Sequence, residues 1–281
     1  MSVSSSNAPI VTIGSHRCRV VAHSSVNPRY RYIQLESTSS TPPVAAPGQF
    51  YQLKCPITLE FAPFLLRPMS VYAVDPESRR IAFLYNVTGT GTRALASLKV
   101  GEEMDIVGPL GNTFTFDPAY ARILLVARGV GLATMASLAR QAARAGVAVT
   151  AIMSARSRAD LMEEAFLGGI EADVHVVLDE DRSSAVETVE ALVRELVERQ
   201  CPDAVYTCGS QRLLMALQRQ LRDRPDIVAE VAMEQRMACG MGVCLSCVRL
   251  FDCDGTKEFL RVCREGPVFR IRDVVGEVEF G

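Results

Sequence analysis

The sequence has few histidines, no long run of basic residues and no long uninterrupted apolar segment. Its three histidines, His16, His23 and His175, lie far apart, and no Ser/His/Asp set or pair of carboxylates can be picked out. General acid–base catalysis by side chains is therefore not expected. The formal net charge is −2, without a basic stretch, so nucleic acid is not an expected partner.

A membrane span and a secretory signal are also missing from the pattern. The most apolar stretch, ILLVARGVGLATMASLA, carries Arg128 and two glycines, whereas a spanning helix needs about 20 predominantly apolar residues. The first residues, MSVSSSNAPIVTIG, lack the positive start and apolar core of a signal peptide. We expect a cytoplasmic protein in which residues 1–9 form a flexible tail.

The remaining chain divides into three regions that differ in their pattern of apolar residues. Residues 10–118 contain short apolar runs broken by Gly, Pro and Ser, which predicts an antiparallel β-barrel. Residues 119–228 alternate apolar strands such as RILLVA with helical segments such as TMASLARQAARAG, which predicts an open parallel sheet with helices. Residues 229–281 show little periodicity and are too few to form a large core. We therefore expect a cross-link or bound group to stabilise them. The predicted fold class is multidomain, β plus α/β.

What is abundant is cysteine near the C-terminus. The spacing is Cys239-x4-Cys244-x2-Cys247-x15-Cys263, and five of the nine cysteines fall in the last region. An odd, clustered set does not suggest a disulfide framework. Plant-type [2Fe-2S] ferredoxins use C-x4-C-x2-C followed by a distant cysteine. The spacing therefore predicts a [2Fe-2S] cluster bound by these four residues and one-electron transfer.

Two glycines within the cysteine triplet support this interpretation. Gly240 and Gly242 allow positive φ and a close approach of backbone N–H groups to cluster sulfurs. A structural zinc site is the alternative, although zinc usually draws two well-separated pairs. The remaining cysteines are expected to be spare or structural: Cys253 a spare thiol, and Cys18, Cys55 and Cys201 buried as small apolar residues.

Three segments of the first region are typical of a flavin or diphosphate site. LLRPMSV places an arginine and a serine at the start of a predicted strand, and VGPLGNTF adds a further glycine turn. LYNVTGTGTRAL supplies Gly89, Gly91 and Thr92 before a short helix, where backbone N–H groups can face an anion. Each segment alone is also compatible with a plain hairpin turn.

The second region carries two features of a nucleotide site. VARGVGLAT places Gly129 and Gly131 between a strand and a helix, with Thr134 where the third glycine of a dinucleotide fingerprint would stand. TCGSQRLLMAL places Cys208 and Gly209 at the carboxyl end of a later strand, where ligands bind in open parallel sheets. We expect Cys208 to contact a nicotinamide; the alternative is that it simply ends the strand.

These segments together resemble a known family. VAMEQRMACGMGVCLSCVRL followed by RVCREGPVFRIRDVV is similar to the C-terminal segment of dihydroorotate dehydrogenase electron transfer subunits, in the two-component NAD-linked form. RPMSV, GTGTRALASLKVGEEMDIVGPLGNTF and TCGSQRLLMAL match the family in the same order. The resemblance implies a ferredoxin-reductase-like fold: an FAD-binding barrel (10–118), an NAD-binding α/β domain (119–228) and a [2Fe-2S] domain (229–281).

The resemblance also implies sites and partners. FAD contacts fall on Arg67, Pro68, Met69, Ser70, Leu84, Tyr85, Asn86, Gly91 and Thr92; nucleotide contacts on Gly129, Gly131 and Cys208; and cluster ligands on Cys239, Cys244, Cys247 and Cys263. In the family an FMN-containing catalytic subunit oxidises dihydroorotate, and electrons pass through the cluster to FAD and then to NAD+. A heterotetramer with two copies of each subunit is implied.

Two departures from the family's usual pattern involve three residues. Ala127 and Arg128 stand where glycines are usual, and Asn86 replaces an arginine common after the tyrosine. An arginine at position 128 either adds charge for a phosphate or blocks the usual pyrophosphate pose. Our interpretation is an iron–sulfur flavoprotein linked to NAD(P)H. The alternatives are a reductase serving a different oxidoreductase or oxygenase, and a non-enzymatic interaction protein stapled by zinc.

Overall fold

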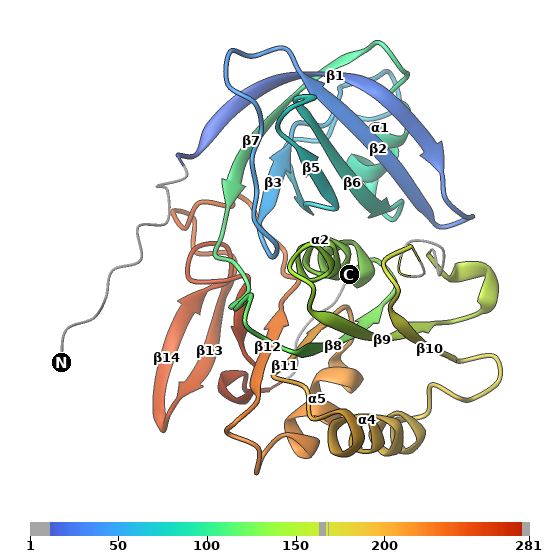
Figure 1. Ribbon diagram of the computed structural model, residues 1–281. Coiled ribbons are helices and arrows are strands. Elements are labelled where there is room, and N and C mark those ends of the chain that lie inside the picture. Colours follow the sequence, from blue (N-terminus) through green and yellow to red (C-terminus); the bar gives the residue numbers. More distant parts are fainter. Residues whose placement is uncertain (1–11, 163–166, 168, 277–281) are drawn as a thin grey trace.

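The computed structural model describes residues 12–162, 167 and 169–276. The expected tail, residues 1–9, lies outside this range. The chain forms an upper antiparallel layer, a lower parallel sheet and a hairpin at one side (Figure 1). Among the helices of the described residues, none is both long and apolar enough to cross a membrane.

The upper layer is a seven-stranded antiparallel sheet that curls around its own core (Figure 1). Its order is β4-β3-β7-β1-β2-β6-β5. The strands are β1 (Gly14–Ser25), β2 (Tyr30–Ser37), β3 (Phe50–Leu53), β4 (Arg67–Ser70), β5 (Ala73–Asp75), β6 (Arg80–Asn86) and β7 (Glu103–Leu110), with helix α1 (Thr90–Ala96) after β6. Alternate residues such as Ile33, Tyr51 and Phe83 point inward and are fully buried. The predicted antiparallel β region is confirmed.

The lower layer is a six-stranded sheet of order β10-β9-β8-β11-β12-β15. The first five of these strands are parallel: β10 (Asp173–Leu178), β9 (Ala148–Ala155), β8 (Arg122–Arg128), β11 (Ala204–Cys208) and β12 (Val228–Ala232). Strand β8 is the apolar run RILLVA, buried on both faces as expected for a central parallel strand. The predicted open parallel sheet is confirmed.

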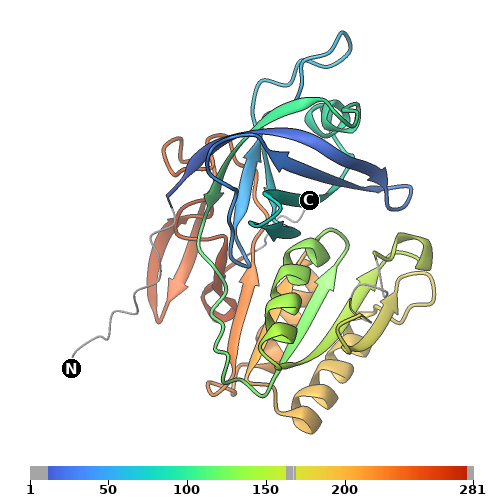
Figure 2. The same cartoon turned by 45° about the horizontal axis from the view of Figure 1, so that its top comes forward.

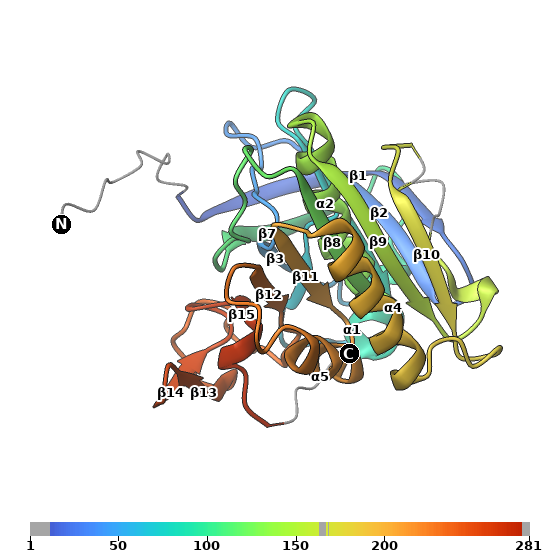
Figure 3. The same cartoon turned by 60° about the horizontal axis from the view of Figure 1, so that its bottom comes forward.

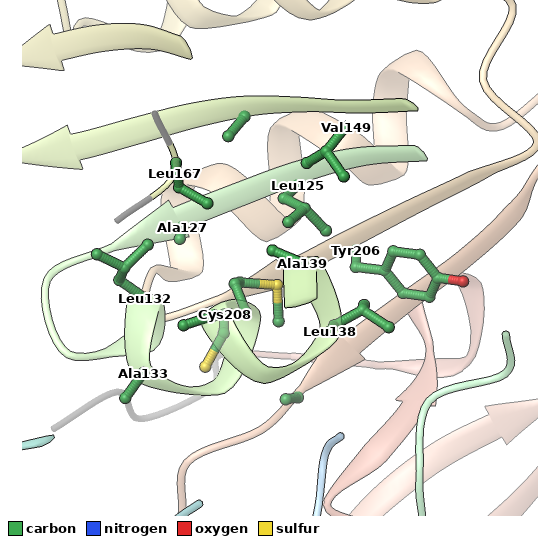
Figure 4. Packing of buried hydrophobic residues seen from close by; sticks show 14 of the residues in the cluster. Leu125, Ala127, Leu132, Ala133, Leu138, Ala139, Val149, Leu167, Tyr206 and Cys208 are labelled. Carbon is green, nitrogen blue, oxygen red and sulfur yellow. The ribbon is translucent and has the colours of Figure 1, made fainter. Parts of the chain in front are cut away.

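Helices cover both faces of this sheet. Helix α2 (Gly131–Arg144) lies between the two layers, and α4 (Val186–Gln200) and α5 (Gln211–Gln220) cover the opposite face (Figures 1 and 2). Leu138 and Ala139 of α2 pack against Leu125, Val149 and Tyr206 from three neighbouring strands (Figure 4). A 3₁₀ turn, η1 (Arg158–Asp160), follows β9. Because α2 also contacts barrel residues, one core cluster joins the two layers.

The C-terminal region packs onto the lower sheet and does not stand alone. Strands β13 (Val248–Cys253) and β14 (Thr256–Arg261) form a hairpin, and β15 (Val268–Arg270) pairs antiparallel with β12. The turn η2 (Ile271–Asp273) contacts both β13 and α5, an arrangement that can be followed in Figure 3. Phe251 and Phe269 stack with ring centroids 4.2 Å apart. Packing on the neighbouring sheet thus provides part of the additional stabilisation that the sequence predicts for this region.

The predicted burial of the three structural cysteines is right in two of three places. Cys18 and Cys55 are buried in the barrel. Cys201 is exposed, so its predicted burial is wrong. It follows the last residue of α4 with a left-handed backbone, φ 47°, a conformation with which helices commonly end, so it lies beyond the buried face that Val193 and Val197 form.

Candidate functional site

A cavity of about 820 Å³ lies where the three regions meet. Its volume falls within the roughly 300–1,000 Å³ of ligand pockets. The barrel contributes Phe50, Arg67, Pro68, Met69, Ser70, Leu84, Tyr85, Asn86, Thr88 and Thr92; the parallel sheet contributes Arg128, Val130, Ala133 and residues 209–212; and the segment after β12 contributes residues 233–237 and Pro267. Eight of the nine predicted FAD contacts therefore share one cavity with residues of both other regions.

The ninth predicted contact, Gly91, makes room for Arg67. A Cβ atom at Gly91 would lie 2.2 Å from Nε and 2.5 Å from Cζ of Arg67. The Arg67 guanidinium donates to the carbonyls of Leu65 and Leu66 from Nη1, at 2.7 and 3.2 Å. The glycine of the TGTGT turn thus lets a cationic side chain lie across the start of α1, at the edge of the cavity.

Thr92 lines the cavity and also bonds to the turn before it. Its Oγ1 accepts from the amides of Thr88 and Gly89, at 2.9 and 3.0 Å, and its hydroxyl donates to the Gly89 carbonyl. Two of the N–H groups expected to face an anion are therefore bonded within the turn. Thr92 fixes the shape of the loop that lines the cavity.

Adjacent residues of β6 face different environments. Leu84 belongs to the core cluster of α2, whereas Tyr85 belongs to the barrel core. The Tyr85 hydroxyl lies 2.8 Å from Nε2 of His23, whose Nδ1 lies 2.7 Å from the Leu98 carbonyl. Burial lowers the pKa of His23, which favours the neutral ring at physiological pH. His23 therefore supports the strand from within the barrel.

The two glycine loops of the parallel sheet pack backbone against backbone. A Cβ at Gly131 would lie 2.5 Å from the Cys208 carbonyl oxygen, and one at Gly209 would lie 2.1 Å from the Arg128 carbonyl oxygen. Gly129 and Gly209 have φ values of 54° and 91°, a region that favours glycine. The glycines thus bring the carboxyl ends of β8 and β11 together at the cavity.

Arg128, one of the two departures from the family pattern, is held by partners within the sheet. Its Nη2 and Nη1 donate to the Asp179 carboxylate at 2.7 and 3.1 Å, and Nη1 also donates to Ser154 Oγ at 2.8 Å. These bonds lower the pKa of Asp179. The side chain extends across the ends of β9 and β10 while still lining the cavity. Sequence reasoning missed Asp179 and Ser154, because their pairing with Arg128 depends on strand order.

Cys208 is buried and is not among the described residues that line the cavity. Its Sγ lies 3.9 Å from both Thr134 Oγ1 and Glu234 Oε1, and burial raises its pKa well above the usual range. Its neighbour Gly209, and Glu234 itself, do line the cavity. The contact between Cys208 and a nicotinamide stays a prediction.

The four predicted cluster ligands come together as two pairs. The Sγ atoms of Cys247 and Cys263 are 3.2 Å apart, and the backbone amide of Cys244 donates to Cys239 Sγ at 3.4 Å. Among the described residues, no three His, Cys, Asp or Glu side chains surround one metal position. Zinc needs four ligands around a single ion, whereas a [2Fe-2S] cluster takes two thiolates at each iron. The two-by-two arrangement fits the cluster better than zinc.

Backbone amides surround these sulfurs, as the two glycines predicted. Gly240 and Gly242 have φ values of 70° and 82°. The amides of residues 241, 243 and 244 each donate to Cys239 Sγ at 3.4 Å, and the Gly242 amide donates to Cys263 Sγ at 3.1 Å. Donors of this kind stabilise negative charge on sulfur. The Ser246 hydroxyl and the amides beside it lower the pKa of Cys244 to about 6, which favours the thiolate that binds iron.

Comparison with known proteins agrees with this geometry. Residues 234–275 match the family model described as the iron-sulfur cluster binding domain of dihydroorotate dehydrogenase B. The chain is 32% identical over 264 residues to the dihydroorotate dehydrogenase B (NAD(+)) electron transfer subunit of Enterococcus faecalis, covering 91% of this chain and 96% of the relative. The subunit from Desulforamulus reducens is 30% identical over 259 residues, covering 92% and 97%.

The chain belongs to the family of dihydroorotate dehydrogenase B electron transfer subunits. Solved structures show the same fold. The NADH-dependent reduced ferredoxin-NADP oxidoreductase matches with a TM-score of 0.74, 24% identity and coverage of 94% of this chain and 90% of that one. The ferredoxin reductase in carbazole 1,9a-dioxygenase matches with a TM-score of 0.64, 21% identity and coverage of 79% and 70%. The predicted family and the ferredoxin-reductase-like fold are confirmed.

Within this family assignment, the individual site residues remain predictions that the geometry supports to different degrees. The eight FAD residues that line the cavity, together with Gly91 beneath Arg67, form one wall. Gly131 shapes the nucleotide side by packing, and Gly129 lines an adjoining smaller pocket. Sequence reasoning missed Phe50 and residues 233–237 as lining. The available signal for the latter was their place inside VAMEQRMACGMGVCLSCVRL, the segment that resembles the family, directly before its cysteines.

Proposed function

We propose that this electron transfer subunit carries electrons between a catalytic partner subunit and NAD(H), through a [2Fe-2S] cluster and FAD. The partner is proposed to contain FMN and to oxidise dihydroorotate, in an assembly of two copies of each subunit. One observation carries the proposal. The cavity wall includes Met237, two residues before the cluster ligand Cys239, so a flavin in the cavity and a cluster on the loop would be neighbours.

Different parts of the chain are proposed to bind the flavin and the nucleotide. When bound, FAD exchanges a hydride with the nicotinamide and single electrons with the [2Fe-2S] cluster, and the redox chemistry belongs to these groups. Arg67 supplies positive charge beside the wall formed by β4, and Asn86 lines the same wall. Gly209 and Ser210 line the opposite side at the carboxyl end of β11, where a nucleotide binds in parallel sheets. We retain the proposed division into residues 10–118, 119–228 and 229–281 as functional units.

The cysteine loop is the proposed contact with the catalytic subunit. Cys244 is exposed, and the apolar side chains of Met241, Val243 and Leu245 around it are 43%, 80% and 58% exposed. Exposed apolar groups that surround a functional group are typical of a docking surface. A partner bound here would also approach the cluster closely enough to exchange electrons.

An anaerobic visible spectrum, titrated with NADH and then with dithionite, tests the electron path. Flavin and [2Fe-2S] bands that bleach with NADH support it. Bands that bleach only with dithionite contradict the nucleotide site and direct attention to Arg128. A colourless protein with zinc overturns the whole proposal.

Co-purification with the catalytic subunit, followed by measurement of the mass of the complex and its FMN content, tests the partner. Equal amounts of the two chains, with one FMN for each pair, support the proposed assembly. A different oxidoreductase or oxygenase as the electron acceptor would contradict it.

A further inference from the structure

Gln52 is a buried polar side chain without an evident partner. It lies in β3 and is 1% exposed. Within the part of the chain that the structure describes, neither Nε2 nor Oε1 has a hydrogen-bond partner. Burying an unsatisfied amide costs free energy, and buried polar groups are nearly always bonded. A side chain that breaks this rule in both of its polar atoms calls for a partner beyond the protein atoms around it.

The strand directs Gln52 away from the barrel core. Tyr51 and Leu53 point into the barrel, whereas Phe50 joins the core cluster of the lower sheet and lines the cavity. Because successive residues of a strand alternate, Gln52 shares the outward face with Phe50. Its cross-strand neighbour in β4 is Pro68, a lining residue of the cavity.

On this outward face, Gln52 meets the cysteine loop. A Cβ atom at Gly240 would lie 2.5 Å from Nε2 and 3.0 Å from Cδ of Gln52. The amide therefore occupies the space beside Gly240, one residue from the predicted ligand Cys239. Gln52 thus stands between Pro68 on the flavin side and the cluster loop on the other.

We infer that Gln52 is a positioning residue of the electron path, whose Nε2–H group donates to the sulfurs at the Cys239 end of the bound cluster. The inference rests on the proposed function. Backbone amides 241, 243 and 244 already point at Cys239 Sγ, and Gln52 adds a donor from the flavin-binding barrel. Because hydrogen bonds to cluster sulfurs stabilise the more negative, reduced cluster, this donor raises its reduction potential.

The test compares Gln52→Leu and Gln52→Met with the wild type and with a matched control, Gln49→Leu. Gln49 lies just before the same strand, but its side chain accepts from the Ala46 amide and donates to the Gly111 carbonyl. Each full-length protein is purified anaerobically and titrated with dithionite and redox mediators. Electron paramagnetic resonance of the reduced cluster and flavin absorbance report the two potentials separately.

We expect Gln52→Leu to lower the cluster potential and shift its g values while the FAD potential stays unchanged. Gln52→Met keeps the length of the side chain and loses the donor without adding a charge, so its cluster potential also falls. Gln49→Leu matches the wild type. The inference is overturned if the Gln52 variants have the same cluster potential and the same g values as the wild type.

The design also separates failure of the inference from failure of the proposed function. A wild-type protein without cluster or flavin bands contradicts the proposed function, whereas a loaded wild type with an insensitive Gln52 contradicts the inference alone. If Gln52→Leu does not fold, Gln52→Met decides, because its side chain has a similar length and no donor: a lowered potential supports the donor role, and an unchanged one overturns it.

Discussion

Replacing Gly91 by alanine should weaken FAD binding by displacing Arg67. The new Cβ would lie 2.2 Å from Nε and 2.7 Å from Nη2 of Arg67, far inside contact distance. The guanidinium is the far end of a flexible side chain, so it can move while the backbone stays in place. That movement breaks its bonds to the carbonyls of Leu65 and Leu66 and removes it from its place in the cavity wall.

The size of the effect follows from the bonds that Arg67 makes. A hydrogen bond to a charged group contributes about 1.5–3 kcal/mol, and the lower end applies because Arg67 is only half-buried. Loss of one such bond to FAD, at about 1.5–2 kcal/mol, weakens binding by about 10- to 30-fold. Without the clash, alanine inside α1 would stabilise the helix by about 0.5–1 kcal/mol relative to glycine. The clash with Arg67 thus predicts weaker FAD binding, whereas helix propensity alone predicts unchanged FAD binding and a more stable protein.

The assay is the dissociation constant of FAD for the flavin-depleted protein, measured from quenching of flavin fluorescence. Gly89→Ala is the matched control in the same turn, since a Cβ there meets no atom within 4 Å and its φ is −133°. We expect it to bind FAD like the wild type. In an Arg67→Ala background, Gly91→Ala should have no further effect, since both changes act on one contact.

FAD affinity that is unchanged in Gly91→Ala, together with a higher melting temperature, would refute this reasoning. That result would mean that Arg67 finds an equally good position or makes no contact with the flavin nucleotide. An additive loss in the double variant would show that Gly91 itself contributes to the site, independently of Arg67.

Three further changes test other parts of the site. Cys247→Ser should abolish the [2Fe-2S] visible bands because Cys247 lies beside Cys263, whereas Cys253→Ser should keep them; equal loss in both would contradict the ligand assignment. Gly209→Ala should lower the free energy of unfolding by about 2–4 kcal/mol, because the Cβ would meet a backbone oxygen 2.1 Å away at φ 91°; a wild-type denaturation curve would refute the close loop packing. Arg128→Ala should cost about 1 kcal/mol at pH 7, since Asp179 is partly exposed. The Asp179 carboxylate, whose pKa is lowered by Arg128, contributes stability above about pH 4 that is lost as the pH falls through its folded-state pKa. The difference between the variant and the wild type in urea denaturation should therefore shrink as the pH falls below about 4; a constant difference would count against the ion pair.

The cluster ligands could be predicted from the sequence because their geometry is mostly local. Three of the four thiols lie within nine residues, Cys239 to Cys247, and the two glycines between the first pair have the positive φ that the loop needs. The layers were predictable for a related reason. An apolar strand followed by an amphipathic helix specifies its own burial, as the buried strand β8 and the packed face of α2 show.

Features that depend on distant pairing were beyond sequence reasoning. Strand β15 has three residues, and its place beside β12 depends on the stacking of Phe251 on Phe269 and on η2 against α5. The bond between Arg128 and Asp179 joins the ends of β8 and β10, two strands that both flank β9. No local pattern marks either pair, because each partner is ordinary in its own segment.

The same distinction explains why the link between the two proposed redox sites was not predictable. Residues 233–237 have no motif of their own, yet they form part of the cavity wall and lead directly to Cys239. Their path is fixed because β12 is held between β11 and β15, and the Met233 amide donates to the Pro267 carbonyl at 2.8 Å. Gln52 approaches the same loop from the barrel side. Sheet pairing fixes the path of the cysteine loop on one side, and the Gln52 side chain packs beside the loop on the other. The separation of the two proposed sites is therefore set by the packed interior of the protein.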